Sequence, residues 1–175
     1  MQARGAPLWR SVWSRRGLRG PLLGEPELVV VEDLLAFAGI TPPTVPVYPI
    51  EKHIAEKLHA YTMPRDRPNS RVKDLPDLVL LGTIRRLDAE RVRAALGQTF
   101  DFRGTHPLPA ALPKPPDAWV APYARMAEDN ELRWRSLPEV FAAASAFLDP
   151  VLAGGLRGSW IVEDWMWGPN ETGEG

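Results

Sequence analysis

Proline limits the regular structure that this chain can form. The sequence has 175 residues and contains 19 prolines, about twice the average share. Proline has no backbone N–H and a fixed φ, so it is disfavoured inside helices and central strands and is tolerated best in the first helical turn. Six prolines fall between Gly104 and Pro122, and we expect this segment to be a long, stiff connection. The segments between the prolines must carry the fold.

Apolar periodicity in those segments predicts mainly helical structure. The run at 27–31 is rich in valine and predicts a short strand, and residues 41–49 are expected to be extended. The fold class is therefore mainly α (α+β), with one or two short strands. We expect helices at residues 32–40, 50–62, 74–84, 89–100, 121–129 and 137–152, with Asp88 and Ser136 as N-caps.

Three segments differ in composition. Residues 1–23 hold five arginines, no acid and no regular period, so we expect an irregular arm. Residues 24–154 carry the predicted elements and form one domain. Residues 155–175 form an acidic, tryptophan-containing tail that we expect to be disordered after Gly168. Its tryptophans are interpreted as anchors on the domain rather than as a surface for a stacked base: Trp160, Trp165 and Trp167.

Charge and cysteine content exclude several classes of protein. Lysine and arginine total 21 against 22 acidic residues, so the net charge gives no indication of a nucleic-acid or membrane partner. There is no cysteine, which excludes disulfides and thiolate chemistry. No apolar run approaches the roughly 20 residues of a membrane span, and the arginine-rich start lacks the apolar region of a secretory signal. We therefore expect a cytoplasmic protein.

A lysine interrupts the apolar face of the helix predicted at 50–62. On a helical wheel Ile50, Ile54, Leu58 and Tyr61 form one stripe, and Lys57 falls inside it. Burying an unpaired ammonium group costs several kcal/mol or neutralises the group. Lys57 therefore needs an anionic partner, from the protein or from a ligand.

The next predicted helix offers such partners. Asp74 and Asp77 are three residues apart and share one face of the helix, which is also its apolar face. If the two inner faces pack together, Lys57 meets both carboxylates in a partly buried cluster. Such a cluster is either a structural ion pair between two helices or part of a binding site.

The turn before this helix is rich in groups that bind anions. Arg71 supplies a bidentate fork and Lys73 a point charge, next to the free backbone N–H groups of a helix N-terminus. Asn69 and Ser70 precede them. The turn alone is also consistent with a solvated, capped helix start. Together with Lys57 and the paired aspartates, it makes a triphosphate site plausible.

These two segments, "YPIEKHIAEKLHAYT" and "NSRVKDLPDLVLL", resemble the C-terminal half of the AbiEii/AbiGii toxin family, the nucleotidyltransferases of type IV toxin–antitoxin systems. The resemblance runs from about residue 24 to 154. It implies a fold of the DNA polymerase β nucleotidyltransferase type, an NTP and Mg²⁺ as cofactors, and transfer to an acceptor such as tRNA. It also implies a role in growth arrest or phage defence, and a cognate antitoxin of the transcriptional-regulator type.

The resemblance assigns roles to individual residues. The lysine of the family's "AEKL" motif matches Lys57 and is taken to contact the nucleotide. The family's "KDxxD" motif matches Lys73, Asp74 and Asp77, with Asp74 as the expected essential carboxylate. We therefore expect Lys57, Asp74 and Asp77 to be catalytic and Lys57, Arg71 and Lys73 to bind the nucleotide, and we identify no metal ligand.

One motif of the family is missing before Lys57. The family carries a Gly-Ser pair followed by Asp-x-Asp or Asp-x-Glu, whose carboxylates hold the metal. Here the only vicinal acidic pair upstream is Glu32–Asp33, and Gly158–Ser159 lies too late. We therefore expect a truncated chain in which catalysis needs carboxylates from a second chain or is absent, with residues 1–23 derived from a frameshift or misassigned start. The alternatives are a non-enzymatic helical module that binds an antitoxin or an intact paralogue, and a decayed fragment.

The three histidines would form a metal site only if their rings converged. His53 and His59 lie on different sides of their helix, and His106 belongs to the proline-rich connection. We do not expect the three rings to converge.

Overall fold

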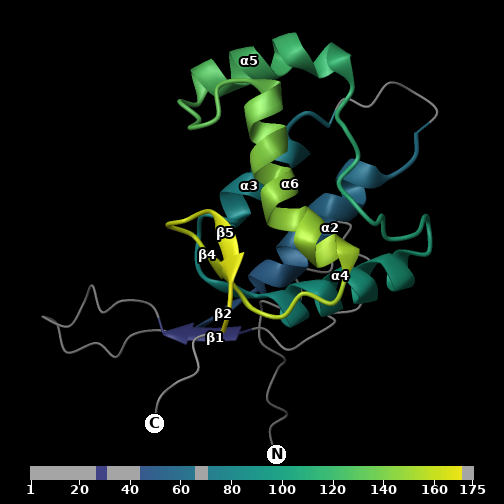
Figure 1. The fold of residues 1–175 in the computed structure, drawn as a ribbon, viewed down its shortest axis with the longest axis vertical. Helices are drawn as coiled ribbons and strands as arrows, with labels where there is room; N and C mark the ends of the chain where they lie inside the picture. The colour runs from purple at the N-terminus through teal and green to yellow at the C-terminus, as the bar shows by residue number, and fades with distance from the viewer. Residues whose placement is uncertain (1–26, 31–43, 66–70, 171–175) are drawn as a thin grey trace, which may run out of the picture.

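A computed structural model describes residues 27–30, 44–65 and 71–170 (Figure 1). This part of the chain is mainly α with short antiparallel strands, which confirms the predicted fold class. The predicted arm at 1–23, the helix at 32–40, and Asn69 and Ser70 lie outside the described residues. In the described part, no helix has both the length and the apolar character that a membrane span requires.

Helix α2 is central to the arrangement of the polar side chains. It spans Ile50–Thr62, as predicted, and packs against α3 (Asp74–Leu81) and α4 (Ala89–Arg103). Ile54 and Leu58 are completely buried in these contacts. Asp88 caps α4 by accepting a hydrogen bond from the backbone N–H of Arg91. Helix α3 ends at Leu81, three residues earlier than predicted.

Helix α6 (Leu137–Ala153) covers the other side of α3 (Figure 1). Its start has the predicted capping box: the Ser136 hydroxyl accepts from the N–H of Glu139, and the Glu139 carboxylate accepts from the N–H of Ser136. A 3-10 turn, η2 (Asp117–Trp119), leads into α5 (Val120–Asp129), which lies across one end of α6. The apolar faces of these helices share one core.

The proline-rich connection runs back over the helices. The Tyr61 hydroxyl of α2 donates a hydrogen bond to the carbonyl of Pro113 at 2.7 Å. The backbone N–H of Leu112 donates to the Asp149 carboxylate of α6, also at 2.7 Å. Apart from η2 and the start of α5, residues 104–122 form no helix or strand. This agrees with the predicted connection, and these contacts attach it to both helices.

The structure contains more strands than predicted. β1 (Glu27–Val30) pairs antiparallel with β2 (Thr44–Val47), in agreement with the expected strand and extended segment. A second, antiparallel sheet has the order β3 (Leu87–Asp88), β4 (Ser159–Ile161) and β5 (Met166–Gly168). Sequence analysis did not predict the β4–β5 hairpin, because three-residue strands are too short to show an alternating pattern.

Tryptophans fix this hairpin to the helices. Trp160 is fully buried, and its Nε1 donates to the Gly82 carbonyl at 2.8 Å. Trp165 and Trp167 donate to main-chain carbonyls of α6. At the base of the hairpin Gly158 has a φ of 148°, and a Cβ there would lie 2.2 Å from the carbonyl oxygen of Gly168, so only glycine fits. The interpretation of the tryptophans as anchors is confirmed.

Candidate functional site

The structure brings Lys57 of α2 to both aspartates of α3. Its Nζ lies 2.5 Å from Oδ2 of Asp77 and 3.4 Å from Oδ1 of Asp74. Arg71, in the turn before α3, places Nη1 3.3 Å from Oδ2 of Asp74. We call Lys57, Arg71, Asp74 and Asp77 the Lys57 cluster. The pairing expected from the two helical wheels is therefore present.

The Lys57 cluster extends from the core to the surface. The Asp74 side chain is 5% exposed, whereas those of Lys57 and Asp77 are 38% and 39% exposed. The Arg71 side chain is half exposed. The buried carboxylate thus holds two partly exposed cations.

Lys57 remains protonated in this environment. Partial burial alone would lower the pKa of its ammonium group. The hydrogen bond to Asp77 and the negative charges of Asp77 and Asp74 together outweigh burial, so the pKa is raised. Near neutral pH the side chain is a cation that a phosphate can approach.

Lys73 precedes Asp74 in the chain, but its side chain forms no described contact with the Lys57 cluster. It is the N-cap residue of α3, and its side chain does not cap the helix. It is exposed, and among the described residues it forms no hydrogen bond or ion pair through its side chain. Arg71 and Lys73 therefore add positive charge at the N-terminal end of α3, where the helix dipole also favours an anion.

A second ionic contact lies six residues earlier on α2. The Glu51 side chain is 7% exposed, and its carboxylate lies 3.6 Å from Nη2 of Arg85 and 3.6 Å from Nε of Arg91. Oε2 of Glu51 is buried and accepts no hydrogen bond from the part of the chain that the structure describes. Sequence analysis did not single out this acid. On the helical wheel Glu51 lies beside Leu58, which indicates that it is buried. Its partner Arg85 could not be predicted, because Arg85 lies after α3 and no helical periodicity relates it to Glu51.

The histidine expectation is wrong for one pair. His59 and His106 lie together, with ring centroids 4.7 Å apart. Nε2 of His59 lies 2.8 Å from the Thr105 hydroxyl, and Nε2 of His106 lies 2.7 Å from the Thr62 hydroxyl. The chain after α4 turns back beside α2, a long-range contact that a helical wheel does not represent. Burial, helped by the charges of His106 and Arg103, lowers the pKa of His59 to about 4. His53 lies apart from this pair.

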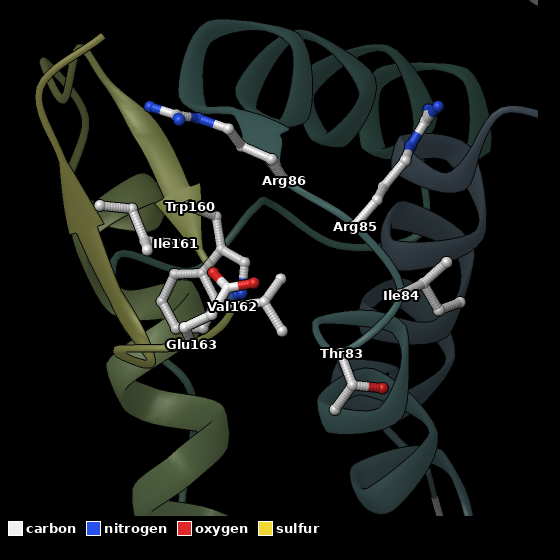
Figure 2. A pocket seen from close by; sticks show the side chains of 8 residues that line it. All are labelled: Thr83, Ile84, Arg85, Arg86, Trp160, Ile161, Val162 and Glu163. Carbon is white, nitrogen blue, oxygen red and sulfur yellow. The ribbon is translucent and has the colours of Figure 1, made fainter. Parts of the chain in front are cut away.

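Two hollows occur elsewhere on the described surface. One, of about 330 Å³, lies between the segment after α3 and the β4–β5 hairpin. Figure 2 shows Arg85 and Arg86 diverging on either side of it, with Glu163 beside Trp160. The other, of about 380 Å³, is lined by His106 and its neighbours. Neither of these two hollows is lined by a residue of the Lys57 cluster.

Comparison with protein families identifies the relationship. Residues 17–146, most of the chain, match the model of the nucleotidyl transferase AbiEii toxin of type IV toxin–antitoxin systems. The chain belongs to this family. The match includes every residue of the Lys57 cluster and begins a few residues before the expected resemblance. A search of curated proteins found no match.

Membership of the AbiEii family sets the general activity. The family is a nucleotidyltransferase toxin of a type IV toxin–antitoxin system, so an antitoxin is the implied partner. Nucleotidyltransferases generally use an NTP and Mg²⁺. Among the described residues, no group of three histidine or acidic side chains is placed to hold a metal ion. Asp74 and Asp77 share the Lys57 ammonium, so we do not assign them as a metal site.

Proposed function

We propose that the Lys57 cluster binds the phosphates of an NTP during nucleotidyl transfer to a macromolecular acceptor such as tRNA. The proposal rests above all on one observation: Lys57 and Asp77 are each more than a third exposed although they form an ion pair. A fully buried ion pair needs complete hydrogen bonding to offset its desolvation, whereas an exposed pair contributes little to folding and keeps its charges accessible. This pair is open on the side that a ligand would approach.

The charges suit a polyanion. Lys57, Arg71 and Lys73 supply three cations where the middle of α2 meets the start of α3, against the carboxylates of Asp74 and Asp77. Arginine binds phosphate through a fork, and lysine binds it as a point charge. Phosphates arriving at the surface would meet two cations that a buried carboxylate already positions. Less side-chain ordering is then required on binding.

Each residue has a distinct role in this proposal. Lys57 contacts the reacting phosphates and offsets the negative charge that develops on them during transfer. Arg71 and Lys73 bind the remaining phosphate oxygens. Asp74 holds Lys57 and Arg71 in place, and Asp77 orients the Lys57 ammonium. Mg²⁺ enters only as the ion that accompanies the NTP, because the described carboxylates do not form a site for it.

The biological setting follows from the family. We propose that transfer takes place in the cytoplasm, arrests growth or acts in phage defence, and is countered by an antitoxin of the transcriptional-regulator type. The alternative is a non-enzymatic module that binds the antitoxin or an intact paralogue. Such a module would bind its partner regardless of NTP and regardless of residue 57.

Binding of labelled NTPs with Mg²⁺ tests the proposal. We expect saturable binding by the chain and a loss of about 10- to 100-fold in affinity with Lys57→Ala, because a charged hydrogen-bonding group is removed. The matched control is Lys114→Ala, which removes an exposed lysine from the proline-rich connection. Equal affinity of the two variants would assign Lys57 to packing alone.

A further inference from the structure

His53 lies one helical turn before Lys57 on α2 and contacts a second ring, that of Tyr48. Tyr48, just before α2, and His53, in its first turns, meet edge to face with centroids 4.8 Å apart and an interplanar angle of 69°. His53 is exposed and Tyr48 is half-buried. An exposed imidazole removes little apolar surface from water, so packing gives a weak reason for this pair.

The tyrosine of this pair is held in place. Its hydroxyl donates to the carboxylate of Glu56 at 3.5 Å, and Nη2 of Arg103 lies 3.7 Å from the same carboxylate oxygen. Burial raises the pKa of the Tyr48 phenol, and the Glu56 charge adds to this effect, so the hydroxyl remains a donor near neutral pH. The ring is therefore fixed before any ligand arrives.

The position of the pair relative to Lys57 suits a nucleotide. His53 and Lys57 are four residues apart on α2, so their side chains are neighbours on one face. The rise of an α-helix separates them by about 6 Å along its axis. On its own helix Lys57 therefore neighbours His53, and across to α3 it shares Asp74 with Arg71.

We propose that His53 and Tyr48 receive the base of the NTP whose phosphates lie at Lys57. This inference rests on the proposed function and deepens it by naming the part of the site that contacts the base. Bases stack on aromatic rings through π-faces that every base has, which gives affinity with limited sequence preference. His53, held against the ordered Tyr48 ring, contacts the base directly, and Tyr48 positions His53.

Comparing an NTP with inorganic tripolyphosphate tests the inference, since tripolyphosphate has the phosphates but no base. Both probes are titrated with Mg²⁺ against the full chain and its His53→Ala, Tyr48→Leu and Tyr48→Phe variants. We expect His53→Ala and Tyr48→Leu to weaken NTP binding by about five- to 100-fold and to leave tripolyphosphate binding unchanged. Tyr48→Phe keeps the ring and should retain most of the affinity. Phe102→Ala removes an exposed ring from α4 and serves as the matched control.

The outcomes separate this inference from the proposed function. Equal weakening of both probes by His53→Ala, or no weakening of either, would overturn the base contact while leaving the phosphate site intact. If the unmodified chain binds neither probe, the proposed function fails and the inference fails with it. If Lys57→Ala weakens both probes and His53→Ala weakens only the NTP, both proposals are supported.

Discussion

Helix α2 carries two ionic contacts that are opposite in sign. At its start one carboxylate, Glu51, lies between two arginines; six residues later one ammonium group, Lys57, lies between two aspartates. Glu51 itself is buried and only its arginines reach solvent. In the Lys57 cluster the central lysine is itself open to solvent, and Asp74 is the buried member.

This difference separates a structural role from a binding role. A buried central charge is surrounded by protein, so its partners mainly offset the cost of its burial. A half-exposed central charge makes a weaker contribution to folding but remains accessible to a ligand. Burial of the central residue, rather than the number of ion pairs, is therefore the reason why we propose the Lys57 cluster, and not the Glu51 contact, as the anion site.

Charge reversal at the buried position should have the largest effect. We expect Glu51→Lys to lower the free energy of unfolding by about 3–5 kcal/mol, because it buries a third cation between Arg85 and Arg91. Glu90→Lys is the matched control: Glu90 pairs with Arg157, and both are well exposed, so its cost should stay below about 1 kcal/mol. Urea unfolding of the two variants measures both values. Equal costs would remove the contrast between buried and exposed pairs.

Low pH should destabilise the fold through His59, a third polar residue of α2. The pKa of His59 is about 4 in the folded chain and near 6.5 when unfolded, so the unfolded state binds the proton first. Stability is complete above pH 6.5 and falls as the pH drops toward 4, by about 2 kcal/mol at pH 5. Urea titrations at pH 7 and pH 5 should show this loss, and His59→Gln should reduce it. If His59→Gln loses as much free energy of unfolding between pH 7 and pH 5 as the unmodified chain, the acid sensitivity does not come from His59.

Much of the fold followed from local signals. The apolar stripe of α2, the Asp88 cap of α4 and the Ser136–Glu139 capping box lie within single segments, and the structure contains each of them. The β4–β5 hairpin is stabilised instead by tryptophan contacts with α3 and α6. Such contacts between distant segments leave no periodic pattern in the sequence.

The same limit applies to the polar sites. Lys57 and Asp74 could be paired because each interrupts the apolar face of a helix, and the two helices are consecutive. His59 contacts His106 because the chain turns back after α4. Glu51 contacts Arg85, which lies in the segment that follows α3. These partners are set by tertiary packing.

Loss of the Lys57 ammonium should have the smallest effect on folding. Lys57→Met removes two ion pairs, yet we expect it to cost less than about 1 kcal/mol, because Lys57 and Asp77 are exposed and Arg71 still pairs with Asp74. Urea unfolding beside the unmodified chain gives the value. A cost near that of Glu51→Lys would make the Lys57 cluster a structural cross-link.

Ligand-induced stabilisation tests the central claim most directly. A saturating NTP with Mg²⁺ should raise the free energy of unfolding of the unmodified chain by about 2.7 kcal/mol at 100 times the dissociation constant. Glu51→Gln, which keeps the shape of the buried side chain, should show the same rise from a lower starting stability. Lys57→Met should show little or none. An equal rise in Lys57→Met and the unmodified chain would contradict the assignment of nucleotide binding to the Lys57 cluster.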